Sequence, residues 1–103
     1  MKLTELDPRW LIKEGRRVGF TFTSPANPRW RQSCFVEKVH KYEQWALFEQ
    51  QGHIETQGCD EKCVWVVAGG IENADLTTIS VTPSLDGSKG GLWHGFITNG
   101  EIR

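Results

Sequence analysis

The chain has no long apolar run and little cysteine. No segment reaches the roughly 18 consecutive apolar residues of a membrane-spanning helix, so no membrane association is predicted. The opening residues, MKLTELDPRW, carry charges where a secretion signal has its apolar centre. The three cysteines, Cys34, Cys59 and Cys63, are an odd number, which favours free thiols over a disulfide framework. We therefore expect a cytoplasmic protein.

A strong charge of either sign is also missing. The 12 Lys and Arg residues nearly balance the 13 Asp and Glu residues, for a net charge of −1. Nucleic-acid binders usually show a basic stripe or patch, so nucleic acid is not expected as a partner. With 103 residues, the chain is long enough for one domain, 1–103, around a single core.

No sustained helical period of apolar residues is present, and most segments resemble strands. The sequence predicts an all-β or β-rich α+β domain, a small antiparallel sheet or partly open barrel with one short N-terminal helix. That helix is predicted over 7–15, with Asp7 as N-cap and Pro8 in the first turn. Segment 43–50 is ambiguous between strand and helical turn, and 51–63 is predicted to be a loop. Strands are expected at 16–24, 33–40, 64–70, 76–83 and 92–102.

Two of these segments carry sharper local signals. In 16–24, Val18, Phe20 and Phe22 alternate with other residues and are expected on one face of a half-buried strand. In 92–102, the pair Asn99-Gly100 indicates a tight turn before a short terminal strand.

Tryptophan is abundant, with five residues. Most are expected in the core, where large rings bury much area in a small domain. Trp30 is the expected exception because Arg29 and Arg31 flank it. Trp30 and Arg31 are therefore candidate binding residues on an exposed surface.

The main chemical candidates are Ser84 and His94, on either side of a glycine-rich loop. If the flanking strands pair antiparallel about Lys89, positions 84 and 94 face each other with Cβ atoms about 5 Å apart. A serine hydroxyl and an imidazole at that distance can hydrogen-bond, as nucleophilic catalysis requires. The alternative is structural: a turn serine after Pro83 and a strand histidine at a bulge.

Supporting groups for such a pair are less defined. Three carboxylates, Asp75, Asp86 and Glu101, are candidates for orienting the imidazole, and the sequence does not choose among them. The glycines near the loop expose backbone N–H groups that can stabilise an oxyanion; they are Gly90, Gly91 and Gly95.

The segments ISVTPSLDG (79–87) and LWHGFITNG (92–100) resemble the C-terminal signature of a small, largely uncharacterised family of phage and bacterial proteins. Its members share a Thr-x-x-Pro-Ser segment followed by a Trp/Cys-His-Gly/Phe-Phe-Ile-x-x-Gly segment. Many phage members bear the label ammonia monooxygenase. Others are encoded beside bacterial ubiquitin-like conjugation genes and are thought to act as peptidases on the ubiquitin-like protein.

The resemblance implies roles for four residues. Ser84 would be the nucleophile and His94 its base, with Thr82 and Gly95 lining the site. Many members also carry cysteine clusters suited to metal, but the matching segments here, TFTSPANP and GGLWHG, contain no thiol. We therefore predict no metal and no cofactor. Free thiols are favoured over a zinc set joining the cysteines to His40 or His53.

Two functions remain open from the sequence. The first is a small cytoplasmic Ser/His hydrolase of a bacterial host cell, a peptidase or esterase acting on a ubiquitin-like or other protein partner. The second is a non-catalytic phage protein that binds a host factor, for example an anti-defence protein, through Trp30, Arg31 and the acidic loop 59–63.

Overall fold

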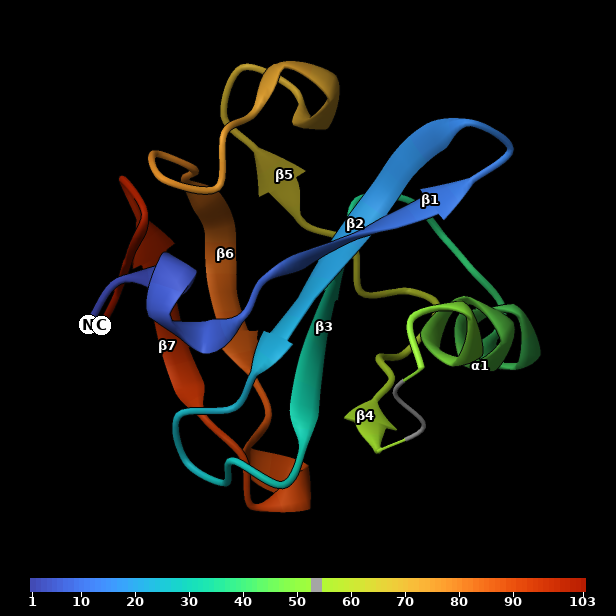
Figure 1. Cartoon of the computed structure of the whole chain (residues 1–103), viewed down its shortest axis with the longest axis horizontal. Coiled ribbons are helices and arrows are strands. Elements are labelled where there is room, and N and C mark those ends of the chain that lie inside the picture. The colour runs from blue at the N-terminus through green and yellow to red at the C-terminus, as the bar shows by residue number, and fades with distance from the viewer. Residues whose placement is uncertain (53–54) are drawn as a thin grey trace.

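A computed structural model describes residues 1–52 and 55–103 and shows two four-stranded sheets and one α-helix (Figure 1). The first sheet has the order β1-β2-β3-β4, with strands Arg9–Lys13, Arg16–Thr23, Arg31–Phe35 and Thr56–Gln57. The second has the order β5-β6-β7-β8, with strands Val66–Val67, Val81–Asp86, His94–Thr98 and Glu101–Ile102. All pairings are antiparallel except β3 with β4. The predicted β-rich α+β class is confirmed.

Within the described residues, helical structure consists of one α-helix and three short turns. The α-helix α1 spans Lys41–Gln50, and the 3₁₀ turns η1, η2 and η3 span Leu3–Leu6, Ile71–Asn73 and Ser88–Gly90. In the described ranges, 1–52 and 55–103, no helix combines the length and apolar character needed to cross a membrane.

The N-terminal helical turn exists, but it lies earlier than the sequence predicted. It ends at Asp7, which adopts a left-handed conformation with φ 48°. The residues expected to be helical instead form β1, which pairs with β2 from Arg9↔Thr21 onward. The segment forms a strand because it can pair with the long strand β2. That pairing provides hydrogen bonds for backbone N–H and C=O groups that a short isolated helix would leave without partners.

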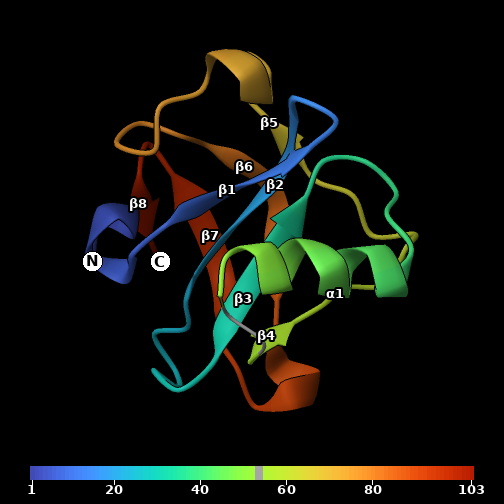
Figure 2. The ribbon, with the colours of Figure 1, turned by 45° about the vertical axis from the view of Figure 1, so that its right-hand side comes forward.

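The first sheet is buried on both faces. One face packs against the second sheet through a cluster that includes Phe20, Phe22 and Ile97. The other face packs against α1 through a second cluster that includes Phe35 and Phe48. Figure 2 shows α1 in front of the first sheet, with β6 and β7 behind it. The layers are therefore helix, sheet, sheet, and β3 is buried at all five positions.

Val18 does not share a face with Phe20 and Phe22, which corrects the sequence prediction. The β1–β2 register pairs Leu11 with Gly19 and Ile12 with Arg17, so Val18 is an extra residue in β2. This bulge turns Val18 toward the helix layer, whereas the two phenylalanines face the second sheet.

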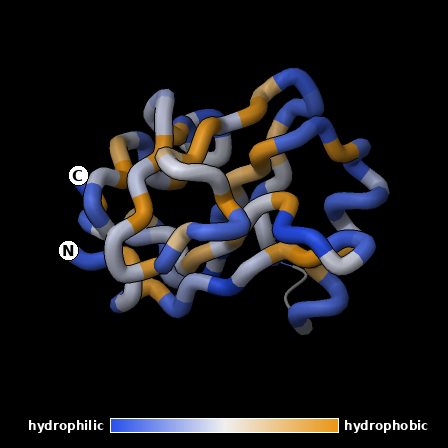
Figure 3. Tube along the Cα trace, turned by 90° about the horizontal axis from the view of Figure 1, so that it is seen from above, coloured by the Kyte–Doolittle hydropathy of each residue, from blue (hydrophilic) through white to orange (hydrophobic). Residues whose placement is uncertain are grey.

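Polar residues dominate the periphery of the fold. In Figure 3, hydrophobic and hydrophilic stretches alternate along the tube, and several of its outer turns are hydrophilic. The two ends of the chain lie side by side (Figure 1), joined by a bridge between Lys2 and Glu101.

Candidate functional site

A tight connection between β6 and β7 carries the predicted Ser/His pair. The Gly87 N–H donates to the Trp93 carbonyl oxygen at 3.0 Å, and the Leu92 N–H donates to the Gly87 carbonyl oxygen at 2.9 Å. Asp86 Oδ1 accepts the Ser88 N–H at 2.9 Å, which orders the start of η3. These hydrogen bonds hold the loop in one defined conformation, so it does not behave as a flexible glycine linker.

The structure brings Ser84 and His94 together, although not through the predicted register. Ser84 Oγ lies 3.4 Å from His94 Nε2. The ladder pairs Val81 with Ile97, but it then shifts and pairs Asp86 with His94. Ser84 therefore reaches the imidazole diagonally, and Asp86 occupies the directly opposed position that the sequence prediction assigned to Ser84. The shift falls in the segment that contains the cis Thr82–Pro83 bond.

Among the three candidate acids, Asp86 is the one beside the imidazole. Asp75 is held by Thr77, and Glu101 bonds to Arg103 on β8. Hydrogen bonds from the Ser88 hydroxyl and N–H lower the pKa of Asp86, and the nearby charges of His94 and Lys89 lower it further. Asp86 is thus an ionised neighbour of His94, engaged by hydrogen bonds with Ser88 instead of with the imidazole.

Two of the three glycine N–H groups expected to stabilise an oxyanion are already used within the loop. The Gly90 N–H donates to the Gly87 carbonyl oxygen, and the Gly91 N–H donates to the Ser88 carbonyl oxygen. Gly95 is buried, and a Cβ there would collide with the Arg103 carbonyl oxygen and the Trp93 ring. Gly90 and Gly91 therefore have no free N–H for an oxyanion, and Gly95 is a position of tight packing.

Thr82, the other residue implied by the family resemblance, lies on β6 and pairs with Val66. It is exposed and lies two residues before Ser84, outside the lining of the neighbouring groove. Thr82 and Gly95 therefore flank the Ser84–His94 pair, but neither residue lines that groove.

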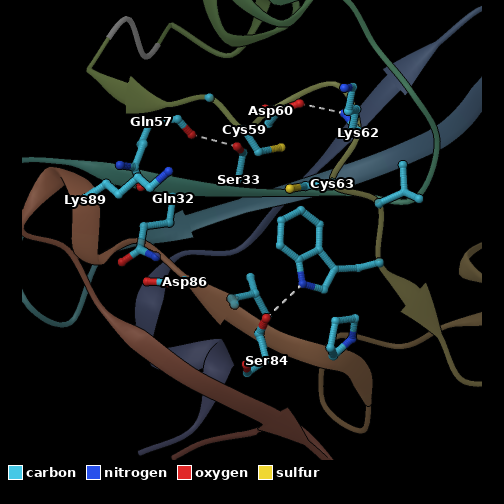
Figure 4. Close-up of a pocket in the computed structure, with 15 residues that line it drawn as sticks. Gln32, Ser33, Gln57, Cys59, Asp60, Lys62, Cys63, Ser84, Asp86 and Lys89 are labelled. Atoms are coloured by element: carbon cyan, nitrogen blue, oxygen red, sulfur yellow. Dashed lines mark hydrogen bonds between the residues drawn. The ribbon is translucent and has the colours of Figure 1, made fainter.

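Ser84 lies at the wall of a groove between the two sheets, with a volume of about 410 Å³. Figure 4 shows Lys89 with Gln32 and Gln57 toward one end, Asp60 and Lys62 at another side, and Ser84 below. The groove is lined by residues of β3, β4, β6 and the loops after them: Gln32, Ser33, Gln57, Gly58, Cys59, Asp60, Lys62, Cys63, Val64, Trp65, Pro83, Ser84, Leu85, Asp86 and Lys89.

Two side chains from outside the β6–β7 hairpin bond to its backbone. The Trp65 indole N–H donates to the Ser84 carbonyl oxygen at 3.2 Å. Gln32, on β3, bonds both backbone groups of Trp93: its Nε2 donates to the carbonyl oxygen at 3.1 Å and its Oε1 accepts the N–H at 2.9 Å. Because Trp93 directly precedes His94, Gln32 fixes the start of β7. This role was not predicted, because a lone glutamine in a sequence gives no signal of its partner.

The three thiols are free, as the sequence predicted. Burial raises the pKa of Cys34 well above its ordinary value and that of Cys59 to about 11. Cys63 is exposed at the groove. Across residues 1–52 and 55–103, no group of three or more His, Cys, Asp or Glu side chains is arranged to hold a metal ion.

The histidines weighed for a zinc set do not join the thiols in the described structure. His40 Nδ1 lies 3.0 Å from Glu61 Oε1, and its ring stacks on Tyr42. His53, the other histidine considered, lies outside the described residues.

Trp30 and Arg31 were both expected on an exposed surface, and the structure confirms this for only one of them. Trp30 is 41% exposed, as predicted, but Arg31 is 4% exposed. The Arg31 guanidinium donates to the hydroxyls of Thr21 and Thr23 and to the Asp7 carbonyl oxygen. Burial lowers the pKa of Arg31. Arg31 therefore ties β3 to β2 and the N-terminal turn, and it is not available as a surface contact.

Of the other four tryptophans, three pack against the core as expected and one does not. Trp45 on α1 is 53% exposed, while Trp10, Trp65 and Trp93 are partly buried against the core between the sheets. The fully buried rings are phenylalanines instead.

Comparisons with known proteins add no identification: no family model, no curated protein and no solved structure matches the chain.

Proposed function

We propose that the protein is a small Ser/His hydrolase, a peptidase or esterase, whose substrate lies in the groove beside Ser84. The observation that carries the proposal is the 3.4 Å approach of Ser84 Oγ to His94 Nε2. Ser84 also lines a groove of about 410 Å³, whereas His94 lies outside its lining. The nitrogen that faces the hydroxyl is the one that acts as base in serine hydrolases. The resemblance to the phage and bacterial family supports a ubiquitin-like or other protein partner in a bacterial cytoplasm.

The proposed chemistry needs only groups on the chain and water. His94 Nε2 takes the proton of the Ser84 hydroxyl as Oγ attacks the substrate carbonyl carbon. The protonated imidazole then gives its proton to the leaving amine or alcohol, which departs as an acyl-serine forms. Water attacks that ester, returns a proton through His94, and frees Ser84. The negative charge of Asp86 favours the imidazolium that forms in each half of the cycle.

Labelling with a fluorophosphonate tests this proposal. The Ser84 oxygen displaces fluoride from phosphorus, and mass spectrometry of the digested protein identifies the modified residue. We expect labelling of the wild type, none of Ser84→Ala, and strongly reduced labelling of His94→Ala. His40→Ala is the matched control, because His40 is also exposed and also lies beside a carboxylate. A folded wild-type protein that stays unlabelled at Ser84 contradicts the proposal.

A second candidate is a non-catalytic protein that binds a host factor, for example an anti-defence protein. Two observations favour it: Trp30 is exposed, and Asp86 bonds to Ser88 rather than to His94. Exposed aromatic side chains often anchor protein interfaces. A pull-down from bacterial lysate separates the two functions. Binding that survives Ser84→Ala and His94→Ala but is lost in Trp30→Ala supports the second candidate and excludes a need for the Ser/His pair.

A further inference from the structure

The outer face of the second sheet carries exposed side chains beside the Ser/His pair. Along β7 every second residue is exposed: His94, Phe96 and Thr98. Successive side chains of a strand point to opposite faces. Ile97, between two of them, is buried in the cluster between the sheets, so the exposed set points away from the first sheet and from α1 (Figure 2). The imidazole of His94 therefore shares an outer surface with the Phe96 ring.

Phe96 also lies across from the segment that carries Ser84. The β6–β7 ladder shifts in register here, so that residues 82–84 lie opposite Phe96 alone. His94 precedes Phe96 by two residues, which along a strand is about 7 Å and within reach of an aromatic side chain. The ring of Phe96 thus borders both members of the Ser84–His94 pair.

Two neighbours extend this surface across the sheet. Val67 and Val81 face the cluster between the sheets, so Val66 and Thr82, the residues next to them in β5 and β6, face outward. Val66 pairs with Thr82, and Thr82 lies opposite Phe96. Phe96 is 54% exposed and Val66 is 65% exposed. Val66, the methyl group of Thr82 and the Phe96 ring form one row, here called the apolar row.

The charged groups beside the apolar row are engaged with other groups of the chain. Arg103 exchanges two backbone hydrogen bonds with Phe96, and its guanidinium donates to Glu101. Asp86, opposite His94, accepts hydrogen bonds from the Ser88 N–H and hydroxyl. The row itself carries no charged side chain. An apolar group is therefore the ligand chemistry that matches it.

The small size of the apolar row limits its occupant. A stable protein interface buries about 800 Å² on each partner. A fully buried aromatic side chain contributes about 150–250 Å². One half-exposed phenylalanine with a valine and a threonine methyl group falls well short of a protein interface. The row matches a single apolar side chain or acyl chain, held beside the group that reacts.

We infer that the apolar row is a specificity subsite, in which Phe96 receives the apolar side chain or acyl chain joined to the carbonyl carbon that Ser84 attacks. The inference rests on the proposed function, because it takes Ser84 as the nucleophile. It goes further by naming the substrate class: esters or peptides with an apolar group on the acyl side of the bond that breaks. The subsite extends the substrate contacts from the groove, which Ser84 lines, to the outer face, where His94 lies.

Acylation by two p-nitrophenyl esters tests the preference. Ser84 Oγ attacks the ester carbonyl carbon, His94 takes the hydroxyl proton, and p-nitrophenolate leaves as the acyl-serine forms. The hexanoate is compared with the acetate. Each rate is corrected for the Ser84→Ala background and divided by the rate of the same ester with hydroxide. We expect a corrected rate about five- to twentyfold higher for the hexanoate, because its four additional methylene groups are partly covered by the Phe96 ring.

Variants of Phe96 test the role of the ring. Phe96→Ala is expected to bring the hexanoate-to-acetate ratio close to one, whereas Phe96→Leu keeps part of the preference because leucine is also apolar. Tyr42→Ala is the matched control: Tyr42 is an aromatic residue on α1, 73% exposed, and its removal is expected to leave the ratio at the wild-type value. Circular dichroism checks that each variant is folded. A wild-type ratio near one, or an unchanged ratio in Phe96→Ala, overturns the inference.

Failure of the inference and failure of the proposed function are distinguishable. If both esters acylate Ser84 at equal corrected rates, the inference fails alone. If neither ester acylates Ser84, the hydrolase proposal fails, and an NMR titration decides the inference. Hexanamide, which does not react, is then expected to shift the amide signals of Phe96 and Thr82 more than acetamide does, and equal shifts overturn the inference.

Sedimentation velocity tests a different occupant of the apolar row, a second copy of the chain. We expect the wild type and Phe96→Ala to sediment alike. A wild-type dimer that Phe96→Ala dissociates would show that the row is covered by another protein molecule, which overturns its assignment as a substrate subsite.

Discussion

Asp86 lies directly opposite His94 in the β6–β7 ladder, and Ser84 meets the same imidazole from the diagonal position. Gly87 and Trp93, the next pair, exchange a backbone hydrogen bond, so Asp86 and His94 form a non-hydrogen-bonded pair. In such pairs the two Cα atoms are only about 4.5 Å apart, and the side chains are close. The imidazole therefore has a hydroxyl on one side and an ionised carboxylate nearby.

The first prediction concerns this carboxylate. Asp86→Asn removes the negative charge that favours the imidazolium, so fluorophosphonate labelling of Ser84 is expected to slow by roughly three- to fivefold at low salt. The effect is expected to shrink at high ionic strength, because exposed charges are screened. Asp75→Asn is the control, since Asp75 bonds to Thr77 and not to the site. Equal labelling rates for the two variants would show that Asp86 does not influence His94.

The second prediction concerns Gln32, which connects the first sheet to the start of β7. Gln32→Ala leaves the Trp93 N–H and carbonyl groups without these partners in a partly buried place. We expect a loss of about 1–3 kcal/mol in the free energy of unfolding, measured by urea denaturation. Gln57→Ala, on the adjoining β4, is the control and is expected to cost less. A Gln32→Ala variant as stable as the wild type would contradict the anchoring role.

The third prediction concerns Gly95. A methyl group there would collide with the Arg103 carbonyl oxygen and the Trp93 ring, because the chain after β8 crosses this position. Gly95→Ala is expected to lower the free energy of unfolding by about 1–3 kcal/mol. Thr98→Ala, exposed on the same strand, should change it by less than about 0.5 kcal/mol. Thermal unfolding followed by circular dichroism compares the variants. Equal stability would show that the backbone after β8 shifts to accommodate the methyl group without a loss in the free energy of unfolding.

The fourth prediction concerns the reactivity of the thiols. At pH 8 iodoacetamide is expected to modify Cys63 first, Cys59 slowly, and Cys34 only on unfolding. Exposure sets this order, and burial raises the pKa values of the last two thiols, so that their reactive thiolates are rare. Peptide mapping over time measures the order. Modification of Cys34 at the rate of Cys63 in folded protein would contradict its burial.

The fifth prediction concerns stability in alkali. A thiol whose folded pKa is raised binds its proton more tightly in the folded state, so folding is favoured below the unfolded pKa, near 9.0. This contribution is lost as the pH rises toward the folded value of about 11 for Cys59. Wild-type stability is therefore expected to fall between these values, and Cys59→Ser is expected to fall less steeply. Urea denaturation at several pH values compares the two slopes, and parallel curves would contradict the prediction.

Local signals in the sequence predicted local structure well. The Asn99-Gly100 pair forms the expected turn, and both residues have positive φ, 49° and 75°. The strand assignment of β2 is also confirmed, because its aromatic and β-branched residues carry a clear pattern. The free thiols and the exposure of Trp30 follow from composition and neighbours alone.

Features that depend on distant partners were not predictable. The burial of Arg31 needs Asp7, Thr21 and Thr23, which come together only when the strands pair. The helix α1 also lacked a clear apolar period, since Gln44 occupies one of its buried positions and bonds to Val39 and Cys59. The Ser84–His94 contact was predicted from the hairpin, but its register was wrong because the ladder shifts between Val81 and Leu85.

Each sheet takes its strands in the order in which they follow one another along the chain, β1 to β4 and then β5 to β8. Most pairings therefore close short loops, which costs little entropy and favours rapid folding. The bridge between Lys2 and Glu101 is different, because it joins the two ends of the sequence. We expect the hairpins to form early and this closure to come late. Destabilising changes in the β6–β7 hairpin would then slow folding, whereas Leu3→Ala would mainly speed unfolding, a difference that stopped-flow measurements detect.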